Sequence, residues 1–326
     1  MCFRRVTSLV VFIAVAGVSQ AAPLREADVA PGAAWFAHVD FEKLGKSEAG
    51  RIFHETFPKF GGALERLRKE AGFDVREHLS GVTVYGSKRE GRGAVVIRHG
   101  FSNEKLAVWL KPYLVAGPEK TGSHYALPVG RIMPAAPIKT VVATLPREGV
   151  AVLSVDEEGV TEAVARLGEG GSASEKELFA LFATGTVEVT GGEKVTPKEF
   201  RAKAFIVAGA NVRELAAGRG KELPGLDAMG RMQVFVSGEG GDVTVLLGVQ
   251  IRSKEELAGI RELLHAFAIA QRPRFKGLVL KSGTAEGKDA VAGGPWLVVK
   301  VAMPARSLVA GLAAEREQLA GAVGGS

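Results

Sequence analysis

A histidine, three acidic residues and a serine fall within one short stretch, AWFAHVDFEKLGKSEAG at residues 34–50. Residues two apart in a strand point to the same side, so His38 and Asp40 could form a histidine–carboxylate pair for acid–base chemistry. Ser47 could be a nucleophile, but the Gly-x-Ser-x-Gly elbow fails because Ala49 replaces its second glycine. We therefore interpret Asp40 as the N-cap of a helix and His38 as a side chain at the end of a strand.

The sequence also lacks the motifs of a zinc site and of a phosphate-binding loop. HETFP at residues 54–58 begins like a zinc-binding helix motif, but Pro58 stands where the second histidine is needed. The glycine clusters GEGGS and SGEGGD lack the lysine and serine or threonine of a phosphate loop, and they fit a linker and a hairpin tip. We expect no catalytic residue, no metal site and no cofactor.

The first residues have the order of a secretion signal. Arg4 and Arg5 precede the apolar run LVVFIAVAGV, and the small residues of SQAAP follow. We assign residues 1–22 to a signal peptide. Ser19 and Ala21 sit three and one residues before a cut after Ala21, and a cut after Ala22 is the alternative. The protein is then exported to the periplasm or the extracellular space.

The mature chain has no thiol and only a small net charge. The single cysteine, Cys2, lies in the signal peptide, so neither a disulfide nor a thiolate metal site forms after processing. Removing Arg4 and Arg5 takes the Lys+Arg count from 42 to 40 against 36 Asp+Glu, a net charge of about +4. The charges are interspersed, which is typical of solvated faces and argues against nucleic acid as a partner. No later apolar run is long enough to cross a membrane.

The chain contains an internal repeat of pattern. AWFAHVDFEKL at residues 34–44 aligns with FIVAGANVREL at residues 205–215, each an apolar strand that runs into a helix. Two further segment pairs correspond in the same way, and each contains a hairpin and a helix: 86–110 with 237–260, and 138–167 with 277–312. Short polar residues stand at the predicted helix starts, where a side-chain oxygen caps exposed N–H groups: Asp40, Asn211, Ser102, Ser253 and Asp156.

The pattern predicts an α+β protein made of two tandem copies of a β-α-β-β-α-β-β-α unit. The sheets are largely antiparallel, and helices cover one face of each sheet and leave the other free. Apolar stripes such as Leu257, Ile260, Leu264 and Phe267 are expected to face a sheet. The domains follow the signal peptide in this order: a first repeat at 23–167, a linker with an edge hairpin at 168–200, a second repeat at 201–320 and a tail at 321–326.

A resemblance supports the same location and layout. A signal, a proline-led strand that runs into HVDFEKLGKSEAGR and two α+β copies resemble uncharacterised families of exported bacterial proteins of unknown function. The resemblance implies export and architecture, and it carries over no catalytic residue.

Three hypotheses about function follow. The preferred one is a non-catalytic envelope protein, a binding, adaptor or scaffold module whose partner is a protein or another envelope component. The second is a carrier of lipid or another apolar ligand. The third is a hydrolase whose residues meet only in the folded chain, such as His38 with a distant acid and Ser47.

Overall fold

The computed structural model divides the chain into two compact units. Unit 1 comprises Met1–Gly45 and Lys59–Phe179, and unit 2 comprises Lys46–Pro58 and Ala180–Ser326. Residues 1–21 of the signal peptide, 168–177 of the linker and the tail lie outside the described residues. The described ranges are 22–30, 32–56, 69, 78–86, 93–115, 124–128, 140–167, 178–180, 185–216, 228–285, 295–311 and 313–314.

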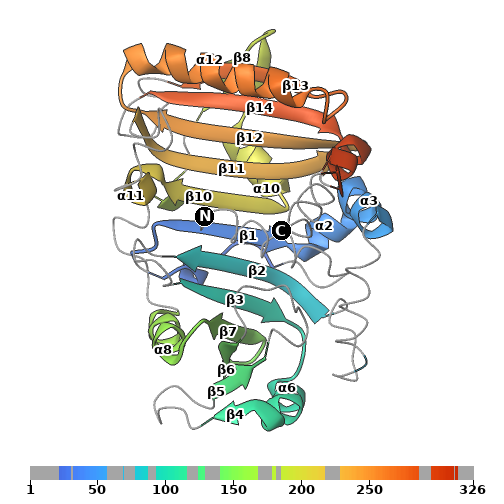
Figure 1. Ribbon diagram of the computed structural model, residues 1–326, viewed down its shortest axis with the longest axis vertical. Coiled ribbons are helices and arrows are strands. Elements are labelled where there is room, and N and C mark those ends of the chain that lie inside the picture. The colour runs from blue at the N-terminus through green and yellow to red at the C-terminus, as the bar shows by residue number, and fades with distance from the viewer. Residues whose placement is uncertain are drawn as a thin grey trace, which may run out of the picture. The chain divides into compact units, whose positions relative to one another are not determined.

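Unit 1 contains an antiparallel sheet (Figure 1). Its strands lie in the order β4-β5-β6-β7-β3-β2-β1. They are β1 (Trp35–Asp40), β2 (Leu79–Gly86), β3 (Gly93–His99), β4 (Leu114–Val115), β5 (His124–Leu127), β6 (Val141–Arg147) and β7 (Val150–Ser154). The helices are η1 (Glu26–Asp28), α2 (Phe41–Lys46), α6 (Asn103–Leu110), η2 (Lys111–Tyr113) and α8 (Glu157–Arg166).

The strands of unit 2 are also antiparallel and lie in the order β10-β11-β12-β14-β13-β8-β9. Its strands are β8 (Val187–Val189), β9 (Glu193–Val195), β10 (Ile206–Asn211), β11 (Met229–Glu239), β12 (Asp242–Ile251), β13 (Val279–Ala285) and β14 (Trp296–Pro304). Its helices are α3 (Glu48–Thr56), α10 (Pro197–Lys203), α11 (Val212–Ala216) and α12 (Lys254–Gln271), and a further helix covers 305–311. The protein is therefore α+β, with antiparallel sheets.

Two glycines allow the tight turn between β11 and β12. Glu239 pairs with Asp242, so only Gly240 and Gly241 connect β11 to β12, and their φ angles are +61° and +90°. A two-residue loop of this kind needs positive φ at both positions, which glycine adopts without strain. The cluster SGEGGD is thus a hairpin tip.

Helices cover both faces of the sheet in unit 1, so the prediction of helices on one face is wrong. Leu110 of α6 packs with Tyr125 and Ala143 on one face. α8 packs on the other face, where a Cβ added to Gly159 would overlap Ser154 Oγ. β2 is buried along its whole length. Its valines point to one face of the sheet and Thr83 and Tyr85 point to the other, so this strand is covered on both faces. Strands of this kind need cover on both sides.

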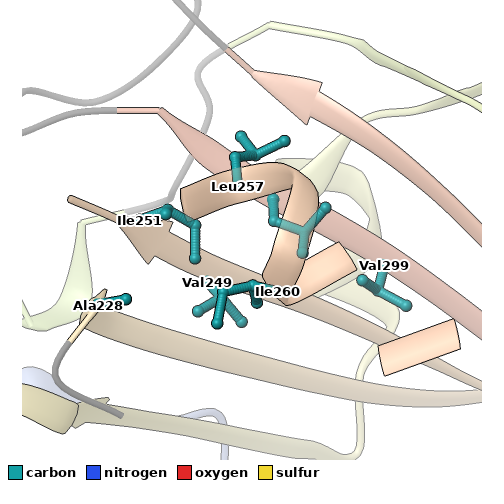
Figure 2. Close-up of a cluster of buried hydrophobic side chains, with 7 residues drawn as sticks. Ala228, Val249, Ile251, Leu257, Ile260 and Val299 are labelled. Carbon is teal, nitrogen blue, oxygen red and sulfur yellow. The ribbon is translucent and has the colours of Figure 1, made fainter. Parts of the chain in front are cut away.

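In unit 2, α12 covers one face of the sheet. Leu257 and Ile260 of the helix lie over Val249, Ile251 and Val299 of the strands (Figure 2). Leu297 belongs to the same cluster and is fully buried. Each apolar side chain buried in this way contributes about 1.5–3 kcal/mol to stability.

The C-terminal half of α12 departs from the predicted stripe. Phe267 does not face the sheet, and 63% of it is exposed. Leu264 and Ala268 pack toward the core clusters in this part of the helix, which leaves Phe267 on the flank.

The opposite face of the unit 2 sheet is also filled. Trp296 and Phe235 are each only 1% exposed, and the guanidinium carbon of Arg231 lies 5.6 Å from the centre of the Trp296 ring. The Gln233 side chain donates a hydrogen bond of 2.5 Å to the carbonyl of Ala180, so residues before β8 run over this face. No helix in the described part of the chain has the length and apolar character needed to cross a bilayer.

The packing of α12 predicts unequal costs for two substitutions on the same helix. Ile260→Ala removes a side chain that is 5% exposed and should lower the free energy of unfolding by about 2–4 kcal/mol. Leu263→Ala is the matched control, because Leu263 is 52% exposed, and it should cost less than about 1 kcal/mol. Urea denaturation of both variants measures the difference, and equal losses would contradict the packing.

Candidate functional site

His38 lies in a buried polar cluster of unit 1. The register pairs His38 of β1 with Thr83 of β2, which places both side chains on the same face of the sheet. The imidazole Nδ1 lies 2.9 Å from Thr83 Oγ1, and Nε2 lies 3.0 Å from the carbonyl oxygen of Ala22. Since a carbonyl only accepts, Nε2 carries the proton, and Nδ1 accepts from the Thr83 hydroxyl.

Burial keeps this imidazole neutral. His38 is 2% exposed, and desolvation lowers its pKa from 6.5 to about 4, although Asp40 and Asp28 act in the opposite direction. At neutral pH the ring is an uncharged link between β1, β2 and the chain at Ala22. Both of its nitrogens are engaged in the folded protein.

Asp40 caps α2. Its Oδ1 accepts a hydrogen bond of 3.1 Å from the backbone N–H of Lys43, the third residue of the helix. The Lys43 ammonium lies 3.7 Å from Oδ2, so the carboxylate is also part of an ion pair. His38 and Asp40 share a face of β1, but their hydrogen bonds go to different partners.

The other predicted cap residues each accept a hydrogen bond from the residue three positions on. The bonds are Lys105 N to Ser102 Oγ (3.3 Å), Gly159 N to Asp156 Oδ1 (2.7 Å), Glu214 N to Asn211 Oδ1 (3.3 Å) and Glu256 N to Ser253 Oγ (3.3 Å). Ser47, the candidate nucleophile, accepts from Gly50 N at 3.0 Å and so caps α3. It belongs to unit 2, whereas His38 belongs to unit 1.

The sequence did not reveal the ion pair between Asp28 and Arg98. Arg98 donates from Nε to Asp28 Oδ2 at 2.7 Å and from Nη2 to Oδ1, so the contact is bidentate. The Asp28 side chain is fully buried, and that of Arg98 is 11% exposed. The pair fixes η1 on β3 near His38. The only signal in the sequence is an arginine at the end of an apolar strand.

A second unpredicted cluster lies in unit 2. Lys281 and Lys300 are directly opposite each other on β13 and β14, and both ammonium groups contact the carboxylate of Glu193 on β9. Their hydrogen bonds hold the pKa of Glu193 below its ordinary value. The cluster ties the β8–β9 hairpin to the main sheet.

One further polar pair connects α12 to the sheet. His265 Nε2 lies 3.1 Å from Ser282 Oγ on β13. Among the residues that the structure describes, no three histidine, cysteine or acidic side chains are grouped in a way that could hold a metal ion.

Comparison with known proteins yields only distant structural similarity. No protein-family model matches the chain, and no curated protein matches it. The chain is similar to crystal form III of TP0453 with a TM-score of 0.48 and 8% identity, covering 90% of this chain and 99% of that chain. Crystal form IV gives 0.46 and 8%, with 88% and 96% covered, and crystal form I gives 0.44 and 9%, with 91% and 99% covered. All three TM-scores are below 0.5.

Stability should fall in acid because of His38. Below pH 6.5 the unfolded chain binds a proton at His38 that the folded chain takes up only near pH 4. The free energy of unfolding should therefore drop by up to about 3 kcal/mol between pH 6.5 and pH 4 and change little from this cause below pH 4. Urea denaturation across this range measures the effect.

His38→Gln is the matched variant for this measurement, because an amide can keep both hydrogen bonds without titrating. Between pH 6.5 and pH 4, the free energy of unfolding of the His38→Gln variant should fall by about 3 kcal/mol less than that of the wild-type protein. His99, whose pKa burial also lowers, is present in both proteins and cancels in the comparison. The same pH dependence in both proteins would contradict a buried neutral His38.

Breaking the Asp28–Arg98 pair should be costly. Arg98→Met leaves the buried carboxylate of Asp28 without its partner and should lower the free energy of unfolding by about 3–5 kcal/mol. The double variant Asp28→Leu/Arg98→Met removes both charges and should lose less. Chemical denaturation measures both variants, and a larger loss in the double variant would contradict a buried pair.

Proposed function

We propose that this protein is an exported, non-catalytic binding module of the cell envelope, which uses the exposed flank of α12 that carries Leu263 and Phe267 to bind a protein partner. Export is supported by the twin arginines, the apolar run and the small residues that precede Pro23.

We also propose that the two units arose by tandem duplication. The strand order β1-β2-β3-β7-β6 in unit 1 corresponds to β10-β11-β12-β14-β13 in unit 2. In each unit the first strand leads directly into a short helix, which Asp40 or Asn211 caps. A duplicated architecture suits an adaptor, because one copy can diverge to bind while the other keeps its role.

The observation that carries the binding proposal is the exposed apolar surface of α12. Leu263 and Phe267 lie one helical turn apart on the same side of α12 and are 52% and 63% exposed, whereas Ile269, which is 60% exposed, lies on another side. From Leu263 to Ala270 the helix has no charged side chain on any side. Exposed apolar clusters of this kind mark interaction sites.

The chemistry of this surface favours a protein partner. Aromatic and aliphatic side chains that project from a rigid helix are typical anchors for the apolar pockets of another protein. Arg272 and Lys276 follow the helix, are exposed, and would form a polar rim that favours an acidic partner surface. Because α12 is held by a buried core on its inner side, the surface is presented without rearrangement.

Two alternatives predict different occupants. A carrier would hold lipid or another apolar ligand, and a hydrolase would act on a small substrate through His38, a distant acid and Ser47. In the present proposal these side chains have structural roles: His38 bridges strands, and Ser47 caps α3.

Site-specific photocrosslinking in the native host tests the proposal. A benzophenone amino acid at position 267 should give one discrete protein adduct, and the same group at position 258 on the exposed polar part of α12 should not. Leu263→Glu in the same chain should abolish the adduct. Binding of the purified partner should weaken at least tenfold with Leu263→Glu and stay within twofold with Ala258→Glu.

Two results would overturn the proposal. Adducts of equal yield at positions 258 and 267 would show that α12 has no specific site. Crosslinks to lipid alone at position 267 would identify the surface as a lipid contact.

A further inference from the structure

The described part of the chain begins at Ala22, which is packed into unit 1. Ala22 is 5% exposed, whereas the next residue, Pro23, is exposed. The carbonyl of Ala22 accepts the hydrogen bond from His38 Nε2 at 3.0 Å. A Cβ added to Gly81 would lie 3.0 Å from this carbonyl oxygen and 3.1 Å from the methyl group of Ala22. Glycine at position 81 therefore leaves the space that Ala22 fills.

The hydrogen bond from His38 needs the carbonyl of Ala22. The Nε2–H of His38 is a buried donor, and the Ala22 carbonyl is its acceptor. Without Ala22 the donor has no such acceptor, and burying an unpaired polar group is unfavourable. Six residues later the Asp28–Arg98 pair anchors the same segment a second time. Residues 22–28 thus form a strap that is held at both ends.

We infer that the signal peptide is removed between Ala21 and Ala22, and that Ala22 is the amino-terminal residue of the mature protein. The inference rests on the proposed export, since a signal peptidase supplies the cleavage. Water adds across the Ala21–Ala22 peptide bond and gives a carboxylate on Ala21 and an α-ammonium on Ala22. A cut one residue later, at the end of the predicted 1–22 segment, would remove the acceptor of His38 from the folded protein.

The sequence on the other side of the bond agrees with this position. Ser19 and Ala21 place small residues three and one positions before the cut, as a signal peptidase requires. The buried seat of Ala22 selects between the two cuts that the sequence allows.

Intact-mass measurement of the protein recovered from the envelope of its host tests the position of the cut. The expected mass corresponds to a chain that starts at Ala22. A chain that starts at Pro23 or later would overturn this inference and leave the proposed export intact. An uncut chain would overturn the proposed export and this cleavage together.

A thermal-stability cycle tests the role of Ala22 without export. Chains that begin at Ala22 or at Met-Leu24 are produced in the cytosol, each with His38 or with His38→Leu. With His38 present, the shorter chain should melt roughly 2–4 °C lower. In the His38→Leu background the same deletion should have a clearly smaller effect, because no buried N–H loses its acceptor. An equal effect in both backgrounds would overturn the seating of Ala22 on His38.

Discussion

The strands of both units carry buried side chains on both of their faces, so each sheet needs cover from two sides. In unit 1, β2 is buried from end to end. Val96 of β3 and Val152 of β7 lie on the same face of the sheet as Thr83 of β2, and both are fully buried. In unit 2, Leu297 and Val298 are both fully buried although they point to opposite faces. Among the described residues, the segments at 22–30 and 178–180 also contact these strands, through Ala22, Asp28 and Ala180.

This two-sided burial also explains where the polar side chains go. A polar group on a covered face needs a partner within the protein, because unpaired burial is costly. His38 bonds to Thr83 and Ala22, Asp28 pairs with Arg98, and Gln233 reaches the Ala180 carbonyl. His38, which looks most like a catalytic residue in the sequence, is therefore a link between the sheet and its cover. We place the binding site on the apolar surface that stays exposed on α12.

Local features of the structure were predictable from the sequence, because their signals lie within a few residues. A cap residue bonds to the N–H three positions on, as Asp156 does to Gly159, and two glycines mark the β11–β12 turn. The long-range pairs were not predictable. Asp28 and Arg98 are 70 residues apart, and nothing in either neighbourhood identifies the other. The prediction that one face of each sheet is free was wrong for a similar reason. The alternation of apolar and polar residues along a strand does not show which distant segment covers its second face.

The measurement that tests the account most directly is native mass spectrometry of the protein extracted gently from its own envelope, with the Leu263→Glu variant alongside. If α12 is a protein-binding surface, the wild-type chain should retain a second protein that the variant loses, and denatured spectra should identify it. A lipid-sized adduct retained equally by both proteins, with no second protein, would contradict the account and support a carrier.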